Sequence, residues 1–251
     1  MIVIKNKASL QKMSTAGQLL NEIFREIVSE IRSGVSTLEL DQLIARLIKE
    51  KGLSSKTMGY MGYCHSSCIS LNDEVVHGVP SAKKILKDGD LVKVDICVSW
   101  KGHCADMARA FYVGTMPEDV KRFVHNAQRA LKKGIDQARP GNKLSDISAA
   151  IQEEIEKEGY GIVREFAGHG IGKQMHEDPE ILNFGEPGQG PTLQPGMTFA
   201  IEPMITMGKH DVYICKDGWT VKTVDKSLAM HVEDTVVVTN GEPKILTQTA
   251  V

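Results

Sequence analysis

The chain has 251 residues, of which 41% are hydrophobic and 25% charged, and its formal net charge is -2. A chain of this length buries a core without staples, and a charge near zero gives no basic excess for binding nucleic acid. Its five cysteines, an odd number, do not form the pattern of a disulfide framework, so we expect free thiols. No segment reaches about 18 uninterrupted apolar residues, so we expect no membrane span, no signal sequence and a cytoplasmic location.

Hydrophobic periodicity predicts the same kind of unit twice along the chain. In chain order we expect helices over residues 8–32 and 36–52, strands over 91–98 and 107–113, helices over 117–131 and 147–159, and strands near 197–206 and 232–239. The second helix begins with a capping-box pattern, Ser36 followed by Glu39. The first two strands are joined by a turn around Trp100 to Gly102, as in a hairpin. This order predicts an α+β fold in which helices pack on an antiparallel sheet.

A self-comparison of the sequence supports an internal duplication. At an offset of 107 residues, matched positions include Gly34 with Gly141, Leu40 with Ile147, Ile44 with Ile151, Gly52 with Gly159, Gly89 with Gly196 and Asp95 with Glu202. After a 20-residue insertion in the second copy the offset becomes 127, at which Asp106 matches Glu233 and Gly114 matches Gly241. We therefore expect a single domain over residues 1–251, built from halves of about 1–115 and 116–251 that are related by a pseudo-twofold axis.

Two aspartates in the predicted hairpin are candidate metal ligands. Asp95 lies in the apolar run LVKVDICV, where a charged carboxylate is costly unless it is paired or bound to a cation. With the turn centred between Trp100 and Lys101, Asp95 stands opposite Asp106, and the two side chains share one face. Two carboxylates there either share a proton or hold a cation between them. The duplication adds Glu202 and Glu233, and four converging carboxylates favour the cation.

His169 lies in the glycine-rich segment FAGHGIGKQMHEDP, where small residues leave the backbone open to a ligand. Oxygen ligands with few imidazoles suit manganese, iron(II), cobalt or zinc. The same glycines do not form a phosphate-binding loop, because Ala167 stands where the motif needs glycine and Gln174 where it needs serine or threonine.

These motifs resemble those of the type I methionine aminopeptidases, in their minimal bacterial form, over nearly the whole chain. The resemblance rests on NDEVVHGVP with His77, KVDI with Asp95, ADMARAF with Asp106, GHGIG with His169, MHEDP with His176, FAIEPM with Glu202, DGWTVKT with Trp219 and HVEDTVVVT with Glu233. It implies the pita-bread fold and two divalent metal ions. It further implies that Asp106 and Glu233 bridge the ions, that Asp95 chelates one, and that His169 and Glu202 complete the other.

The resemblance also implies a reaction and a substrate. A water activated by two metal ions attacks the scissile carbonyl, with Glu202 as proton shuttle and His77 and His176 as further catalytic and substrate-binding residues. The methionine side chain is held by a pocket that corresponds to Tyr60, Tyr63, Cys68, Met175 and Trp219. Met175 stands where the family usually has an aromatic residue, and Met61 where a histidine is common. The expected substrates are nascent polypeptides at the ribosome with a small second residue, and the expected enzyme is a cytoplasmic monomer.

The sequence also allows a proline-specific peptidase, a type II methionine aminopeptidase or an inactive binding module. Proline-specific relatives share the catalytic half but usually carry a large preceding domain, and type II methionine aminopeptidases carry a longer insertion. A catalytically inactive binding module lacks the ligands, and all five are present in this chain. Cys97 and Cys104 are expected to flank the aspartates, as packing residues or as a redox-sensitive pair, and activity that depends on reductant distinguishes the two roles.

Overall fold

The computed structural model describes residues 1–248, so the last three residues of the predicted domain lie outside the described part. The helices are α1 (Lys7–Ile27), α2 (Thr37–Glu50), α3 (Glu118–Gln137) and α4 (Leu144–Glu156), with 3₁₀ turns at Val28–Glu30 and Tyr60–Gly62. The strands are β1 (Ser54–Ser55), β2 (Cys68–Leu71), β3 (Leu91–Trp100), β4 (His103–Tyr112), β5 (Gly161–Ile162), β6 (Gly168–Gly170), β7 (Glu177–Ile181), β8 (Thr198–Ile201), β9 (Met204–Thr206), β10 (Val212–Ile214), β11 (Val221–Thr223), β12 (Ala229–His231), β13 (Glu233–Val237) and β14 (Lys244–Ile245). The predicted α+β composition is confirmed.

The predicted helix starts are stabilised by local caps. Asn6 accepts the backbone N–H of Ser9 at 2.9 Å at the start of α1. At α2 the predicted capping box is present, because Ser36 Oγ accepts the N–H of Glu39 and the Glu39 carboxylate accepts the N–H of Ser36. Such a cap contributes about 1 kcal/mol to helix stability.

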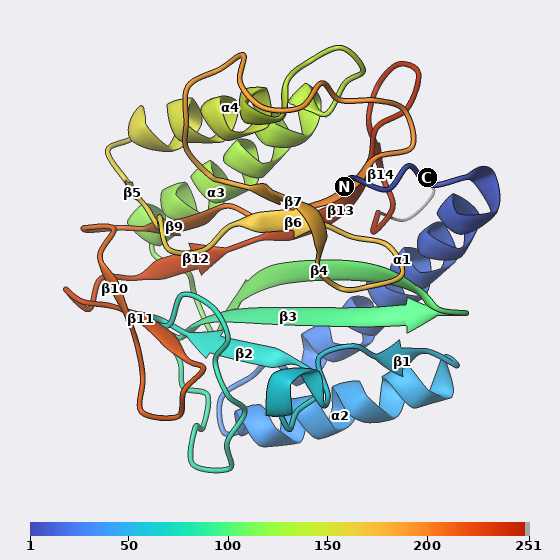
Figure 1. Ribbon diagram of the computed structural model, residues 1–251. Coiled ribbons are helices and arrows are strands. Elements are labelled where there is room, and N and C mark those ends of the chain that lie inside the picture. Colours follow the sequence, from blue (N-terminus) through green and yellow to red (C-terminus); the bar gives the residue numbers. More distant parts are fainter. Residues whose placement is uncertain (249–251) are drawn as a thin grey trace.

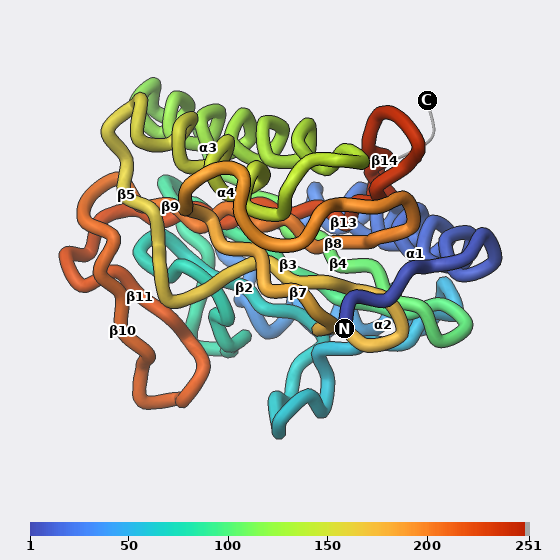
Figure 2. The backbone as a smooth tube through the Cα atoms, turned by 45° about the horizontal axis from the view of Figure 1, so that its top comes forward, coloured from blue at the N-terminus to red at the C-terminus, as the bar shows by residue number. Residues whose placement is uncertain are grey.

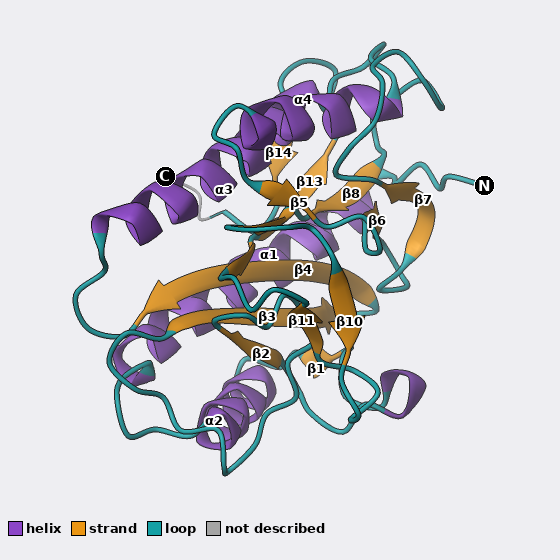
Figure 3. Cartoon of the chain, turned by 90° about the vertical axis from the view of Figure 1, so that its left-hand side faces the viewer, coloured by secondary structure: helices purple, strands orange, loops and turns teal. Residues whose placement is uncertain are grey.

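One antiparallel sheet runs through both halves of the molecule, in the order β1-β3-β4-β13-β8-β6-β7, with β2 beside β3 and β14 beside β13. The helices cover one face of it: α1 and α2 pack on β3 and β4, and α3 and α4 lie over β8 and β13 (Figures 1 and 3). Alternate side chains of β3, such as Val92 and Val94, enter the core under α1 and α2. The intervening side chains, Asp95 among them, therefore point to the face without helices.

The duplication is visible in the backbone. Helices α2 and α4, and the short strands β1 and β5, begin 107 residues apart. The matched glycines Gly34 and Gly141 have φ angles of 90° and 93°, a region that favours glycine. Isolated bridges join Ser36 to Ile85 and Lys143 to Thr192, again 107 residues apart. The predicted two-halved arrangement is present over the described residues.

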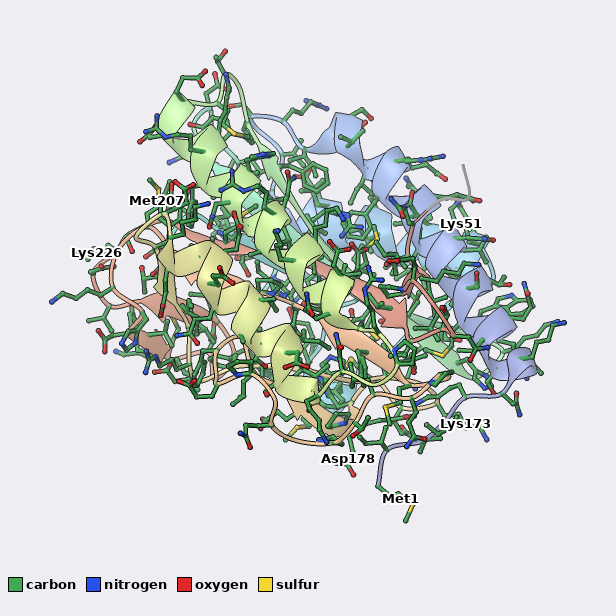
Figure 4. All side chains as sticks on the ribbon, turned by 90° about the horizontal axis from the view of Figure 1, so that it is seen from above. Met1, Lys51, Lys173, Asp178, Met207 and Lys226 are labelled. Atoms are coloured by element: carbon green, nitrogen blue, oxygen red, sulfur yellow. The ribbon has the colours of Figure 1, made fainter. Side chains whose placement is uncertain are left out.

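The N-terminal segment of the first half reaches across to the second half. The N–H of Lys5 donates to the carbonyl of Gly196 at 2.8 Å, and its ammonium pairs with Glu177 at 2.7 Å. The amine of Met1 pairs with Asp178, and both residues lie at the same end of the molecule (Figure 4). None of the described helices combines the length and apolarity needed to cross a membrane.

The hairpin register corrects one prediction. Lys101 and Gly102 form a two-residue turn with positive φ angles of 47° and 74°, the feature of a type I′ turn, so the turn is centred one residue later than predicted. Asp95 consequently pairs with Ala108, and Asp106 pairs with Cys97. The predicted direct opposition of Asp95 and Asp106 is wrong, and the two aspartates are diagonal neighbours on one face.

The second hairpin corrects the predicted equivalence of Asp106 and Glu233. Strands β8 and β9 pair with β13 and β12 in one continuous register, which brings Glu202 opposite Glu233 and Met204 opposite His231. Since Asp95 corresponds to Glu202, this register places Glu233 at the position of Ala108 and His231 at the position of Asp106. The structural offset of this strand is therefore 125 residues, from Asp106 to His231, rather than the predicted 127.

Candidate active site

Every side chain predicted for the metal site and the substrate pocket lines one cavity of about 360 Å³, a volume in the usual range for small-ligand sites. These residues are Tyr60, Tyr63, Cys68, His77, Asp95, Asp106, His169, Met175, His176, Glu202, Trp219 and Glu233. A larger groove of about 720 Å³ lies beside α1 and α3, but its buried carboxylate, Asp234, is already paired with Arg109 at 2.6 Å. The converging acids of the smaller cavity make it the candidate active site.

The sheet aligns the acidic residues in a row. Cys68 pairs with Asp95, Asp95 with Ala108, and Ala108 with Glu233, and the register continues to Glu202. Neighbouring side chains in such a row are about 5 Å apart. Ala108 has only a methyl group, so the space between Asp95 and Glu233 stays open. Asp106 lies two residues further along the same strand face and closes this space from one side.

The five predicted ligands meet at this space. Single ligand atoms of Asp106, His169 and Glu233 all lie within 4.8 Å of one another. Asp95 is the diagonal neighbour of Asp106 on the same face of the hairpin, and Glu202 Oε1 lies 3.4 Å from His169 Nε2. Residues from both halves thus form a three-residue cluster, and the other two predicted ligands line the same cavity.

The ring of His169 is oriented for ligation. Its Nδ1–H donates to the carbonyl of Gly170 at 2.9 Å, which leaves Nε2 directed at the carboxylates. Burial lowers the pKa of His169 to about 3, so its imidazole is neutral at pH 7. Gly170 packs so closely against the backbone of Asp178 that a Cβ there would lie 2.1 Å from its carbonyl oxygen. Glycine is required here by close packing against a neighbouring strand, and not by the open approach of a ligand to the backbone that the sequence suggested.

Burial and the neighbouring negative charges disfavour the ionised forms of these carboxylates, and a bound cation would offset this. Burial, followed by the charge of Asp106, raises the pKa of Asp95, and burial raises the pKa of Asp106 to about 7. Burial also raises the pKa values of Glu202 and Glu233 well above their ordinary range. The Oε1 atom of Glu233 is buried without a hydrogen-bond partner. Oxygen-rich donors with one imidazole and an unpartnered oxygen fit a divalent metal centre.

Two further histidines, His77 and His176, line the cavity. His77 has a φ of 57°, its ring contacts Phe166 edge-on at 5.5 Å, and burial lowers its pKa to about 4. The ring of His176 lies 4.4 Å from that of His169, and burial lowers its pKa as well. The Tyr60 hydroxyl is 2.9 Å from Nδ1 of His176. Both imidazoles are neutral at pH 7 and line the cavity, where they can form hydrogen bonds with a substrate.

The predicted methionine pocket has a buried floor and an exposed lip. Tyr63 is buried, donates its hydroxyl to the carbonyl of Ser67 at 3.0 Å and contacts Trp219 edge-on at 5.0 Å. Tyr60 is 36% exposed, in a segment that projects from the body of the molecule (Figure 2). Met61, where the resembling family often has histidine, is also at the cavity but 81% exposed. An apolar floor with an exposed rim suits a thioether side chain.

The cysteines are all unpaired thiols, as predicted. Cys97 lines the cavity opposite Asp106, and the Cys104 thiol donates to the carbonyl of Lys173 at 3.5 Å. Both lie on the sheet face that carries the aspartates, as expected from their spacing. Their redox role stays a prediction.

Sequence reasoning missed His231. This side chain is 2% exposed, and its Nε2 lies 3.2 Å from Glu202 Oε2. The available signal was strand alternation, since His231 precedes Glu233 by two residues and shares its face. It also missed Glu165, Phe166 and Glu180 at the mouth of the cavity.

Comparisons with known proteins agree with this geometry. Residues 11–240 match the profile of metallopeptidase family M24. A methionine aminopeptidase of Clostridium acetobutylicum is 42% identical over 247 residues, covering 98% of this chain and 99% of the relative. The crystal structure of a methionine aminopeptidase from Thermotoga maritima superposes with a TM-score of 0.97 at 38% identity, covering 99% of this chain and 100% of the other.

A prolidase from Pyrococcus furiosus is more distant. It superposes with a TM-score of 0.80 at 25% identity, and although the match covers 99% of this chain it covers only 66% of the prolidase. The predicted pita-bread fold and the predicted resemblance are confirmed, and the chain belongs to metallopeptidase family M24.

Proposed function

We propose that this chain is a metal-dependent aminopeptidase that removes the N-terminal methionine from polypeptides. We propose further that Asp95, Asp106, His169, Glu202 and Glu233 hold two divalent ions, which are manganese, iron(II), cobalt or zinc. One observation carries the proposal: ligand atoms of Asp106, His169 and Glu233 lie within 4.8 Å of one another in a cavity that Asp95 and Glu202 also line, and Glu233 Oε1 has no partner. Relatives named methionine aminopeptidase over the full length support the activity.

The chemistry such ions supply when bound is activation of a water and polarisation of the scissile carbonyl. The protein residues then have separate tasks. Glu202 accepts the proton of the attacking water and returns it to the leaving amine, because its carboxylate borders the centre without being locked in a strand. His176 and His77 hydrogen-bond the carbonyl oxygen and the amide of the cleaved bond.

Substrate selection follows from the cavity. The side chain of the first residue enters the apolar floor made by Tyr63, Cys68 and Trp219, which matches the length and polarisability of methionine. A free α-amine beside the carboxylates restricts cleavage to the first residue. We propose a preference for a small second residue, because a bulky one would crowd the metal site. We propose that the reaction takes place in the cytoplasm on nascent chains at the ribosome. We propose further that the enzyme is a monomer.

The test begins with purified protein stripped by a chelator and resupplied with manganese or cobalt. We expect metal-dependent release of methionine from Met-Ala-Ser, little release from Met-Trp-Ser, and no cleavage of Leu-Pro-Gly. Absence of metal-dependent methionine release refutes the proposal. Cleavage of Leu-Pro-Gly in preference to Met-Ala-Ser assigns the site instead to a proline-specific peptidase, the activity named for the more distant structural relatives.

A further inference from the structure

Glu202 has two carboxylate oxygens with different surroundings. Oε1 lies 3.4 Å from Nε2 of His169 and faces the proposed metal centre. Oε2 lies 3.2 Å from Nε2 of His231, on strand β12. Glu202 lines the cavity and His231 does not, so His231 contacts the site through Glu202.

The backbone gives Glu202 little support of its own. The residue follows the end of β8, and Pro203 after it has no N–H for the sheet ladder. The carbonyl of Glu202 accepts a side-chain hydrogen bond from Asn183 at 3.1 Å, which fixes the chain but leaves the carboxylate free to rotate. A buried carboxylate with three rotatable bonds loses considerable entropy when it is held in one rotamer. A side-chain partner is therefore needed to hold it.

His231 is suited to this task by position and burial. In the pairing register it occupies the place that Asp106 has in the first hairpin, since Cys97 pairs with Asp106 and the corresponding Met204 pairs with His231. Only 2% of its surface is exposed, so little water competes for its hydrogen bonds. A hydrogen bond from an imidazole N–H to a carboxylate is charge-assisted and stronger than a neutral one.

We propose that His231 is a positioning residue, whose Nε2–H donates to Oε2 of Glu202 and thereby directs Oε1 to the metal centre. The inference rests on the proposed function, because it assigns the partner that orients one of its ligands. Hydrogen-bonded partners of ligating side chains typically change metal affinity by 10- to 100-fold when they are removed. The same bond keeps Glu202 aimed at the attacking water.

The alternative is that His231 only fills space in the interior. Two substitutions separate the roles. His231→Gln keeps an N–H donor of similar reach, whereas His231→Met keeps an apolar side chain of similar length without a donor. His125→Gln, at an exposed position of α3, is the matched control.

Manganese binding is measured by calorimetry on each metal-stripped protein, together with the steady-state kinetics of Met-Ala-Ser cleavage. We expect His231→Met to lower the affinity for one of the two manganese ions by roughly 10- to 100-fold. We also expect it to lower kcat, with KM largely unchanged. His231→Gln should recover most of both losses. Equal metal affinity and kcat in wild type and His231→Met overturns the inference. A loss in His231→Gln as large as in His231→Met assigns the residue to packing, and also overturns it.

A measurement on the unsubstituted protein avoids any folding defect in the variants. Nitrogen-15 spectra of the zinc-loaded protein should show Nε2 of His231 carrying the proton, with the signal assigned by its absence in His231→Gln. An unprotonated Nε2 cannot donate to Glu202, and that result overturns the inference. If the wild-type protein itself binds no metal, the proposed function fails, whereas metal binding that is indifferent to His231 removes only the role of His231.

Discussion

The two hairpins that supply the acidic residues differ in construction although they derive from one pattern. Strands β3 and β4 form ten uninterrupted pairs, so Asp95 and Asp106 project from a continuous ladder. The second hairpin is interrupted at Glu202 and Pro203, between β8 and β9, and its acids are glutamates with one more methylene. The first half thus offers short ligands on a continuous ladder, and the second offers longer ligands at a break in the ladder.

This difference assigns unequal tasks to the halves. A ligand on a continuous ladder keeps its position while the reaction proceeds, which suits holding an ion. A carboxylate at a strand break has room to change its contacts, which suits proton transfer as well as ligation. In the second half, side-chain partners such as His169 and His231 replace the support that the ladder gives in the first.

The largest expected effect concerns the two inner acids, one from each half. Asp106→Asn and Glu233→Gln each remove a charge from the centre of the cluster. A metal centre supplies several kcal/mol of transition-state stabilisation, so we expect kcat/KM to fall by roughly 10³-fold in both. Asp136→Asn, at a surface ion pair of α3, is the control. Retention of activity in either inner variant would mean that the halves do not share the ions.

The next test exchanges the lengths of the outer ligands. Asp95→Glu adds a methylene on the rigid strand between Cys68 and Ala108, and Glu202→Asp removes one at the break. A displacement of about 1 Å in a catalytic group costs as much as 10²-fold, so we expect close to that loss in Asp95→Glu. Glu202→Asp should lose less, about 10-fold, because Glu202 follows the end of β8 and its carboxylate can rotate. A larger loss in Glu202→Asp contradicts the assignment of rigidity to the first half.

Much of this arrangement was predictable from the sequence, for reasons that are local. Ser36 and Glu39 cap a helix through their own neighbours, and Asp95 stands out because an apolar strand isolates it. Register was less accessible, since it depends on which two residues form the turn. Lys101 and Gly102 have the two positive φ angles of the turn. As a result, Asp106 pairs with Cys97 and not, as predicted, with Asp95.

The role of His231 shows the same limit over a longer range. Its equivalence to Asp106 appears only when the pairing of β12 with β9 is known. The sequence match at an offset of 127 relied on Gly114 and Gly241, but only Gly114 has a positive φ in the structure. The two glycines align in sequence but differ in backbone conformation. Asp106 and Glu233, which align at the same offset, are likewise not equivalent in the structure.

The pH dependence of metal binding distinguishes the carboxylates from the imidazole, because their pKa values differ. Metal competes with protons on the carboxylates, and Asp106 has a pKa of about 7, raised by burial. Manganese affinity should therefore rise from pH 5.5 to 7.5, by up to roughly tenfold per pH unit for each proton displaced. His169, with a pKa of about 3, is neutral throughout this window and adds nothing to the slope. Calorimetry in buffers of different ionisation enthalpy counts the protons, and an unchanged proton release in Asp106→Asn would contradict the assignment to Asp106.

The smallest expected effect tests whether the halves are equivalent away from the site. Gly34 and Gly141 have φ angles of 90° and 93°, and a Cβ built at either meets no atom within 4 Å. Since neither substitution creates a clash, Gly34→Ala and Gly141→Ala should each cost only the conformational term, about 1–2 kcal/mol of unfolding free energy. Urea denaturation of the metal-loaded protein measures both. Equal losses mean that the duplicated frame is energetically symmetric, so the asymmetry of the molecule resides in the strand break at Pro203 and its side-chain partners. A difference well above 1 kcal/mol would place part of the asymmetry in the frame itself.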